Sequence, residues 1–309
     1  MTVLVLGGYG AVGTHLVRLL RARGVTALAA GRDPARADRV VDLTSAKGID
    51  TALSDVSVVV NCAGIEEIGI ARECAARGTT FVDISATSDY VHDLESIDGP
   101  VALGIGLAPG LTTLLAADLL SSTRAPVDIL ITLGAGERHG HAATSWTYQL
   151  LGRHFPDPDG GSIRNFTRPT RFDLPAAAGF PQFPAVRADF ADQHRLTEQF
   201  AVPVRSHLRM DTRLATTGLA ALTWVPALRA LAPSRMPGGD RWLVLARSAD
   251  GPTRWASGSG QSAATAAVAA ACLRVLPHRP ITAPTWIHEF TELNALRQDL
   301  TDAGITLST

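Results

Sequence analysis

The chain has 309 residues, of which 46% are hydrophobic and 18% are charged, and its formal net charge at pH 7 is −1. This composition indicates a well-packed globular protein of about two domains, and the balanced charge argues against a surface for nucleic acid or an anionic membrane. The three cysteines show no CxxC spacing, which argues against a disulfide framework or a cysteine-based zinc site and favours a cytoplasmic protein.

The first third of the chain alternates short apolar runs with helical stretches. Strands are expected at residues 3–6, 26–30, 39–43, 56–60, 80–84 and 100–104, with helices at residues 11–23 and 66–77. Because this rhythm is typical of βαβ units, we predict an α/β fold whose residues 1–118 form a Rossmann domain built on a doubly wound parallel sheet.

The rhythm changes after residue 106, and we predict that residues 119–309 form a second, α+β domain for substrate binding and dimerisation. The expected elements are a helix at 111–122, a strand at 127–133, extended pieces at 162–166 and 171–174, a hairpin of 242–247 with 253–257, and helices at 261–276 and 290–303. We expect the last helix to pack back on the first domain. The apolar residues 214–232 contain threonines and a central proline, so we interpret them as a surface or dimer-interface helix, not a membrane span.

The scarcity of lysine removes several enzyme classes. Lys47 is the only lysine, so the chain has no Walker A motif for binding phosphate. It also has no Tyr-x-x-x-Lys pair, because Leu43 stands four residues before Lys47. A proton donor must therefore be sought among other side chains.

The residues after the first predicted strand carry a dinucleotide-binding signature. Gly8, Gly10 and Gly13 form a Gly-x-Gly-x-x-Gly pattern between a predicted strand and a predicted helix. The first glycine permits a tight turn, the second lets the backbone approach the pyrophosphate, and the third lets the helix pack on the strand. Amide groups at the helix start are expected to receive the phosphate charge. The loop residues expected to contact the cofactor are Gly8, Tyr9, Gly10, Ala11, Val12 and Gly13.

The end of the second predicted strand favours NADP(H), although NAD(H) is kept as an alternative. In NAD-binding domains an acidic residue at this strand end holds the ribose hydroxyls. Here no acid ends the strand, and Arg32 follows Gly31. A guanidinium matches a 2′-phosphate in charge and geometry, whereas the alternative is a solvated loop arginine. Asp42, after the third strand, lines the adenine side or is simply solvated.

Small and polar residues follow the fourth and fifth predicted strands, where the chain usually passes the cofactor. Asn61, Cys62 and Ala63 close the fourth strand, and Ser85 follows the fifth. We predict that all four contact the cofactor, and we interpret Cys62 as a small buried cysteine, not a nucleophile. For Asp83 we favour a structural role over one facing the nicotinamide.

These residues resemble the saccharopine dehydrogenase-like (saccharopine reductase-like) family of NAD(P)-binding oxidoreductases. The resemblance is carried by the segments 7–13, 30–33, 59–64, 81–83, 106–111 and 259–266 and by the ending at 304–305. It implies an NAD(P)-dependent reductase acting on imines formed from amino acids or, as in some relatives, on carbon–carbon double bonds. It also implies that Gly110 stands where the chain enters the substrate domain.

The strongest group of candidate catalytic residues follows the strand predicted at 127–133. His139 and His141 titrate near neutrality and are the favoured proton donors, while a surface loop with two solvated histidines is the alternative. Tyr90 is the next candidate acid, with His92 beside it. The residues expected to bind the substrate are Arg138, Trp146, Tyr148 and Gly110. No third ligand completes a metal site with the histidine pair, so no metal is predicted.

We therefore predict an NADPH-dependent oxidoreductase that reduces an imine or an activated double bond of a small organic substrate. The alternative is a non-catalytic protein that binds NADP(H) and signals through a partner, because a fold alone does not fix function. A homodimer is expected, without nucleic acid or membrane partners.

Overall fold

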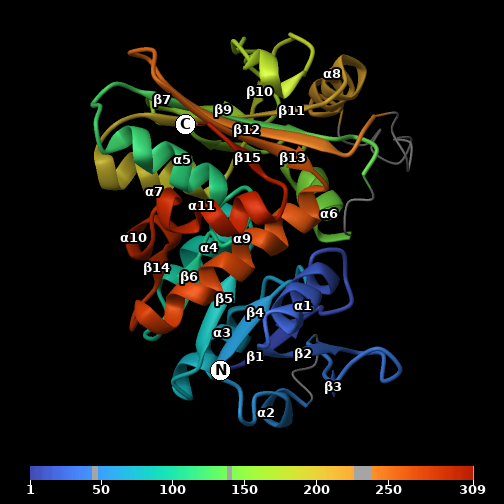
Figure 1. Ribbon diagram of the computed structural model, residues 1–309. Coiled ribbons are helices and arrows are strands. Elements are labelled where there is room, and N and C mark those ends of the chain that lie inside the picture. Colours follow the sequence, from blue (N-terminus) through green and yellow to red (C-terminus); the bar gives the residue numbers. More distant parts are fainter. Residues whose placement is uncertain (44–47, 138–140, 226–237, 309) are drawn as a thin grey trace.

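The structure is a computed structural model that describes residues 1–43, 48–137, 141–225 and 238–308, with only the backbone for residues 141–144. The described part of the chain folds into two large sheets, each with helices packed against it, which lie one above the other in Figure 1. Three residues singled out in the sequence, Lys47, Arg138 and His139, lie outside the described residues.

The first domain is built on a seven-stranded sheet whose strands all run parallel, in the order β14-β6-β5-β4-β1-β2-β3. Its strands are β1 (Thr2–Leu6), β2 (Thr26–Gly31), β3 (Arg39–Val40), β4 (Val58–Asn61), β5 (Thr80–Asp83), β6 (Val101–Leu103) and β14 (Thr285–Trp286). Its helices are α1 (Gly13–Ala22), α2 (Ile49–Ala52), α3 (Ile68–Ala76) and α4 (Ser88–Glu95). The first six strands have the Rossmann order, so the predicted fold class is confirmed.

The strand sequences are apolar because helices cover the sheet on both faces. Every residue of β4 is buried, and α1 turns Leu16, Val17 and Leu20 toward the sheet. The third strand is shorter than predicted and ends at Val40. It is the edge strand, and the next apolar side chains, Val41 and Leu43, are buried in the core beside the sheet.

The second domain is built on a mixed six-stranded sheet in the order β10-β11-β7-β12-β13-β15. Its strands are β7 (Val127–Leu133), β10 (Val186–Arg187), β11 (Val204–Met210), β12 (Arg241–Ser248), β13 (Thr253–Ser259) and β15 (Thr306–Leu307). The antiparallel β12–β13 pair confirms the predicted hairpin. A small separate hairpin joins β8 (His154–Pro156) to β9 (Ser162–Arg164).

Helices fill the space between the two sheets (Figure 1). The remaining helices are α5 (Leu111–Leu120), α6 (His141–Leu150), α7 (Ala191–Phe200), α8 (Arg213–Leu222), α9 (Gln261–Val275), α10 (Ile287–Phe290) and α11 (Leu293–Asp302). Of these, α8 packs on β11, on the side of the second sheet that faces away from the first. Helix α5 packs on the second sheet, and α9 packs on α1 of the first domain. Helix α11 packs on α9 and α5, and its Asp299 pairs with Arg23 at 3.0 Å, just past the end of α1.

Some predicted elements differ from those observed. The helix expected at 290–303 begins only at Leu293, because Thr291 has the extended backbone angles φ −148° and ψ 162°, and Phe290 instead ends the short helix α10. Residues 171–174 form no strand, although Phe172 is buried against the second sheet beside Leu130 and Leu245. The apolar segment 214–232 contributes to α8, and its part from residue 226 onward lies outside the described residues. None of the described helices has the length and apolar character needed to cross a membrane.

Candidate functional site

The loop between β1 and α1 has the close backbone packing that its glycines predict. Gly7 adopts a positive φ of 68°, and its amide and that of Gly8 both donate to Ala30 O of β2. A Cβ on Gly8 would lie 2.6 Å from Ala29 Cα, and one on Gly13 would lie 2.2 Å from Gly7 O. No larger residue fits at either position, so these two glycines fix the approach of the helix to the strand.

Gly10 has a different role, because it is exposed at the mouth of the loop. A Cβ there would meet one atom, Gly7 O at 3.0 Å, so a side chain would require a backbone shift of only a few tenths of an ångström. Just beyond it, the amides of Ala11, Val12 and Gly13 donate to no acceptor in the described part of the chain. Unpaired amides at the N-terminus of a helix are a binding site for an anion such as phosphate.

The end of β2 is covered by the side chain of Tyr9. Its ring lies so close that a Cβ on Gly31 would be 2.6 Å from ring atoms, and its hydroxyl accepts from Asp33 N at 3.0 Å. Arg36 stacks on the same ring, with its guanidinium carbon 4.4 Å from the ring centroid, and donates to Tyr9 O at 3.0 Å. Arg32 is exposed beside this cluster. Two guanidinium groups therefore stand at the strand end where an NAD-binding domain usually has an acid.

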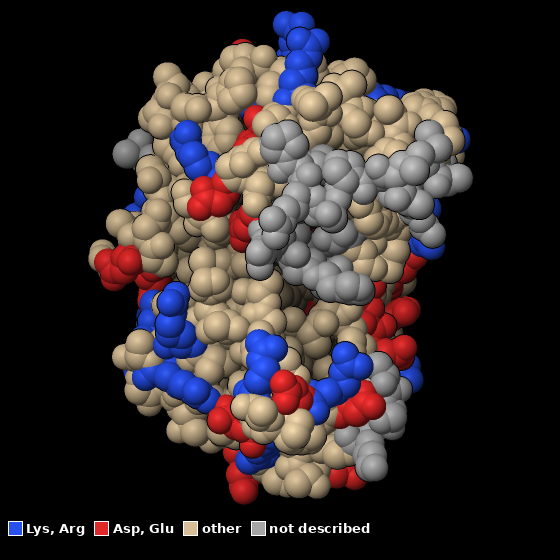
Figure 2. Space-filling view, turned by 90° about the vertical axis from the view of Figure 1, so that its right-hand side faces the viewer, with Lys and Arg blue, Asp and Glu red and all other residues tan. Residues whose placement is uncertain are grey.

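The charges around this region are mixed. Figure 2 shows the side of the molecule on which α1, β2 and β3 lie in Figure 1, and on its lower half basic side chains are interleaved with acidic ones. Asp42, two residues after the end of β3, is half-buried. Because no single sign of charge dominates, any preference for a charged ligand must come from individual groups such as Arg32 and Arg36.

A buried polar network joins the ends of β4 and β5. Asn61 Nδ2 donates to Asp83 Oδ2 at 2.9 Å and to Ile65 O at 3.1 Å, while Ser85 N donates to Asp83 Oδ1 at 2.7 Å. The Tyr90 hydroxyl donates to Asp83 Oδ2 at 3.4 Å. Burial raises the pKa of the Asp83 carboxyl above its usual range, and its hydrogen bonds only partly oppose that rise.

This network determines what its members can do. It anchors the loops after both strands, which is the structural role favoured for Asp83. Tyr90 is only 5% exposed, and burial, together with the nearby Asp83 charge, raises the pKa of its hydroxyl far above the ordinary value. Cys62 is half-buried, and burial followed by the Asp83 charge raises the pKa of its thiol in the same way. A thiol held protonated is a poor nucleophile.

A cavity of about 380 Å³ lies between the two domains. It is lined from the first domain by Thr87, Ser88, Asp89 and His92, and from the second by Trp146, Gln149, Leu150, Arg153, His154, Phe155, Pro156, Asn165, Asp189 and His194. Thr87 stands four residues after β5, and its hydroxyl donates to Glu66 in the loop after β4 at 2.5 Å. The cavity therefore opens beside the carboxyl ends of the parallel strands, where such sheets bind ligands.

Three polar side chains meet on one wall of this cavity. The ring Nε2 of His194 lies 2.6 Å from Asp189 Oδ1, and the Ser88 hydroxyl donates to the same oxygen at 2.8 Å. Asp189 N in turn donates to Asn165 Oδ1 at 2.8 Å. His194 is in the first turn of α7, whose Ala191 N donates to Ala86 O at 3.4 Å. The carboxylate thus bridges the two domains and fixes the orientation of the imidazole.

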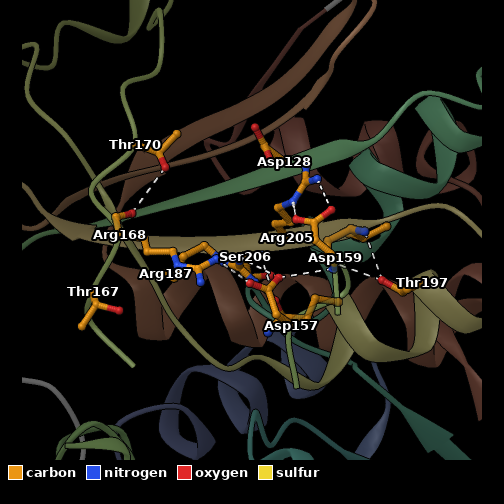
Figure 3. A network of polar contacts seen from close by, with 12 residues as sticks. Asp128, Asp157, Asp159, Thr167, Arg168, Thr170, Arg187, Thr197, Arg205 and Ser206 are labelled. Atoms are coloured by element: carbon orange, nitrogen blue, oxygen red, sulfur yellow. Dashed lines mark hydrogen bonds and ion pairs between the residues drawn. The ribbon is translucent and has the colours of Figure 1, made fainter. Parts of the chain in front are cut away.

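Figure 3 shows an ion-pair network centred on the buried side chain of Asp157. Asp157, directly after β8, pairs with Arg187 at 3.3 Å and with Arg168 at 2.8 Å. The Arg187 guanidinium also donates to Gln193 Oε1 at 3.4 Å, and Gln193 Nε2 donates to Ala188 O at 3.1 Å. The network ties the β8–β9 hairpin to the start of α7, so it holds the residues on either side of the cavity in place.

The remaining predicted site residues are found as follows. His141 is the first residue of α6, and its side chain, with all of Arg138 and His139, lies outside the described part. Trp146 lines the cavity and packs on Phe190 with ring centroids 4.8 Å apart. Tyr148 packs on the main hydrophobic core. Gly110 is buried, and a Cβ at this position would lie only 1.9 Å from Gly106 O.

The structure adds residues that the sequence reasoning missed. Arg36 could have been found, since it follows Arg32 by four residues just after the strand end. Asp189 and His194 carried no local signal, because Ser88, their partner, is 101 residues from Asp189 in the chain. Glu137 stands two residues before His139 in the sequence, and its carboxylate accepts from the amides of Gln261 and Ser262 at the start of α9.

Comparison with known proteins bears on the fold. Residues 3–87 match the model of the NAD dependent epimerase/dehydratase family, while no curated protein matches the sequence. Saccharopine dehydrogenase (L-Glu forming) from Saccharomyces cerevisiae is similar over 99% of this chain and 98% of its own, with 13% identity and a TM-score of 0.64. Homospermidine synthase from Legionella pneumophila, solved in complex with NAD, is similar over 97% of this chain and 89% of its own, with 12% identity and a TM-score of 0.68. The predicted likeness to the saccharopine dehydrogenase-like fold is confirmed.

Proposed function

We propose that this protein is an NAD(P)-dependent oxidoreductase that uses NADPH to reduce an imine of the amino-acid type, or an activated double bond, in a small organic substrate. The observation that carries the proposal is the loop at residues 7–13. It combines glycines that the fold requires, an exposed Gly10 and three amides at the start of α1 that donate to no described residue. Those features suit a pyrophosphate, whose charge the amides and the helix N-terminus would receive.

The preference for NADPH is supported by the end of β2. Arg32 is exposed there, and Arg36 is held on the Tyr9 ring within the same turn. A 2′-phosphate would gain two guanidinium partners at this position, whereas a ribose 2′-hydroxyl would find no acid to accept its hydrogen bond. Stacking on Tyr9 also orders the Arg36 side chain beforehand, which lowers the entropy lost on binding.

The chemistry proposed is reduction of a C=N or activated C=C bond. A bound reduced dinucleotide supplies the hydride, and the protein supplies orientation and a proton. Asn61, Asp83 and Tyr90 hold the loops after β4 and β5, so the face of the cofactor site is fixed by buried hydrogen bonds. The cavity beside these loops has the size of a pocket for a small organic substrate.

The test begins with calorimetric titration of NADPH, NADP⁺, NADH and NAD⁺. We expect NADPH and NADP⁺ to bind. We then expect NADPH to be oxidised in the presence of cyclic imines or conjugated enones, which is measured as the loss of NADPH absorbance. A protein that binds both redox forms with equal affinity and turns over none of these compounds would be the signalling protein considered above. Failure of all four dinucleotides to bind would refute both functions.

A further inference from the structure

We propose that the cavity between the two domains receives the reacting end of the substrate, and that His194, held by Asp189, exchanges a proton with it. This inference rests on the oxidoreductase activity proposed above and assigns the proton to a residue of the second domain. It is carried by the His194–Asp189–Ser88 contacts and by their place at the domain junction.

The position of the His194–Asp189 pair satisfies the first requirement of a proton donor, which is access to the reacting atoms. Ser88 begins α4, five residues after β5 ends, and its hydroxyl is bonded to the Asp189 carboxylate. The backbone contact from Ala191 to Ala86 fixes the start of α7 against the same segment. His194 therefore lies behind the loop that follows β5, at the edge of the sheet where a dinucleotide presents its nicotinamide in Rossmann domains.

The hydrogen bonds of His194 leave one ring nitrogen for chemistry. Nε2 is engaged with Asp189, and no residue in the described ranges is hydrogen-bonded to Nδ1. The His194 side chain is 31% exposed and that of Asp189 is 16% exposed, so solvent reaches the ring more readily than the carboxylate. Phe155 packs edge-on against the imidazole with centroids 6.3 Å apart, which further restricts its rotation. A carboxylate in this place fixes the tautomer and stabilises the imidazolium.

The proton transfer can then be written with its electrons. The hydride forms a C–H bond with the substrate carbon, and the π electron pair moves to the imine nitrogen or, through the conjugated system, to the carbonyl oxygen. That atom takes the Nδ1 proton of the His194 imidazolium, and the N–H bond of the ring breaks. The imidazole is left neutral, with its Nε2 proton still donated to Asp189, and solvent restores the Nδ1 proton.

Other charged and titratable groups face the same cavity, and they define the kind of substrate it suits. They are Asp89 and His92 from α4, Arg153 between α6 and β8, and His154 at the start of β8. Arg153 forms no ion pair with any described residue, so its guanidinium is available to an anionic group on the substrate. Trp146, Leu150 and Phe155 supply the apolar part of the wall. The cavity thus suits a small molecule with an anionic group near its reducible bond.

The decisive experiment does not require the substrate. Histidine-labelled protein is titrated by NMR with pH in its NADP⁺ and NADPH complexes, and the His194 signal is assigned by its absence in His194→Gln. The oxidised nicotinamide carries a positive charge that the reduced ring lacks. If His194 adjoins that ring, its pKa falls by about half a pH unit or more in the NADP⁺ complex relative to the NADPH complex. His278, exposed in the turn Leu276–His278, is the control and should titrate identically in both.

Variants supply the second test once the panel of cyclic imines and enones yields a compound that is turned over. His194→Gln should lower kcat by about 10²–10⁴-fold with unchanged NADPH affinity and unchanged thermal unfolding, while His278→Gln should match the wild type. Asp189→Asn is a positioning variant. It should lower kcat less and move the alkaline limb of the pH–kcat profile to lower pH, because the imidazolium loses its carboxylate partner.

The results separate this inference from the activity on which it rests. No binding of any dinucleotide refutes the proposed function itself. Binding with a His194 pKa that is the same in both redox states refutes the placement of His194, even if turnover is found. Near wild-type turnover in His194→Gln also refutes it, and a loss confined to His139→Ala or His141→Ala would assign the proton to those histidines instead.

Discussion

Replacing Asp157 with asparagine tests how far the second domain depends on one buried carboxylate. The Asp157 side chain is 2% exposed and that of Arg187 is 4% exposed, so the pair is almost completely removed from water. Asparagine keeps the shape of the residue but removes the charge, which leaves the Arg187 guanidinium with Gln193 Oε1 at 3.4 Å as its main neutral acceptor. The network of Figure 3 would then contain a buried, uncompensated cation.

The expected cost follows from that burial. Removing one partner of a buried ion pair destabilises a protein by about 3–5 kcal/mol, because the remaining charge stays desolvated. Burial already lowers the pKa of Arg187, and the Asp157 charge is the largest opposing influence. The contact of Asp157 with Arg168 adds little, because the Arg168 side chain is 64% exposed. We therefore expect Asp157→Asn to lower the free energy of unfolding of this domain by about 3–5 kcal/mol.

The assay is urea unfolding followed by circular dichroism, with Asp159→Asn as the matched control. Asp159 lies two residues further along and pairs with Arg205 at 2.5 Å, but its side chain is 46% exposed. An exposed pair contributes about 1 kcal/mol or less, so the control should stay close to the wild type. The reasoning fails if Asp157→Asn costs less than about 1 kcal/mol, or if the two variants are equally destabilised.

Three further predictions concern the first domain and its junction with the second. NADPH should bind at least about tenfold more tightly than NADH, a difference of ~1.4 kcal/mol. Arg32→Ala should erase most of this difference in affinity and Arg36→Ala part of it. Equal affinities of the wild type for NADPH and NADH in a calorimetric titration would exclude a 2′-phosphate site. Gly10→Val should abolish NADPH binding with little change in melting temperature, because the new side chain would project where the pyrophosphate lies; unchanged affinity would place the phosphates elsewhere. Burial raises the pKa of Asp192, which accepts hydrogen bonds from Thr112 and Thr113. A carboxyl whose pKa is raised on folding makes the free energy of unfolding fall as pH rises above about 4, so Asp192→Asn should flatten that fall in unfolding curves measured across pH. An unaltered slope would contradict the raised pKa of Asp192.

The first domain could be predicted because its signals are local. Each parallel strand is a short apolar run, and the glycine pattern stands directly between β1 and α1. The polar residues at the strand ends could be identified in the same way, and Asn61 and Asp83 are neighbours in the register of β4 and β5. Residues that follow parallel strands meet at one edge of the sheet whatever lies between them in the sequence.

The second domain was less predictable because several of its central residues are polar. Strand β11 contains His207 and Arg209, which are 2% and 1% exposed, so it does not read as an apolar run. Arg209 is accommodated by the carbonyl groups of Phe183 and Pro181 at 3.0 and 2.9 Å, and burial lowers the pKa of His207 to about 4, which keeps it neutral. Partners this far away in the chain leave no periodic signal in the sequence.

His194, the proposed proton donor, was also missed because Ser88, the partner of the His194–Asp189 pair, is far away in the chain. It lies at a junction where the two domains exchange elements. Strand β14 returns from the end of the chain to the first sheet, while α5 leaves that sheet and covers the second. A pair of domains joined by one linker would hold Ser88 and Asp189 together only through their own weak contact. Here the exchanged elements fix both sides of the junction, so a hydrogen bond from Ser88 can orient the carboxylate that orients His194. The loop at residues 7–13 and the cavity are therefore tied together by elements exchanged between the two sheets, an arrangement that suits the proposed transfer between a bound cofactor and a substrate.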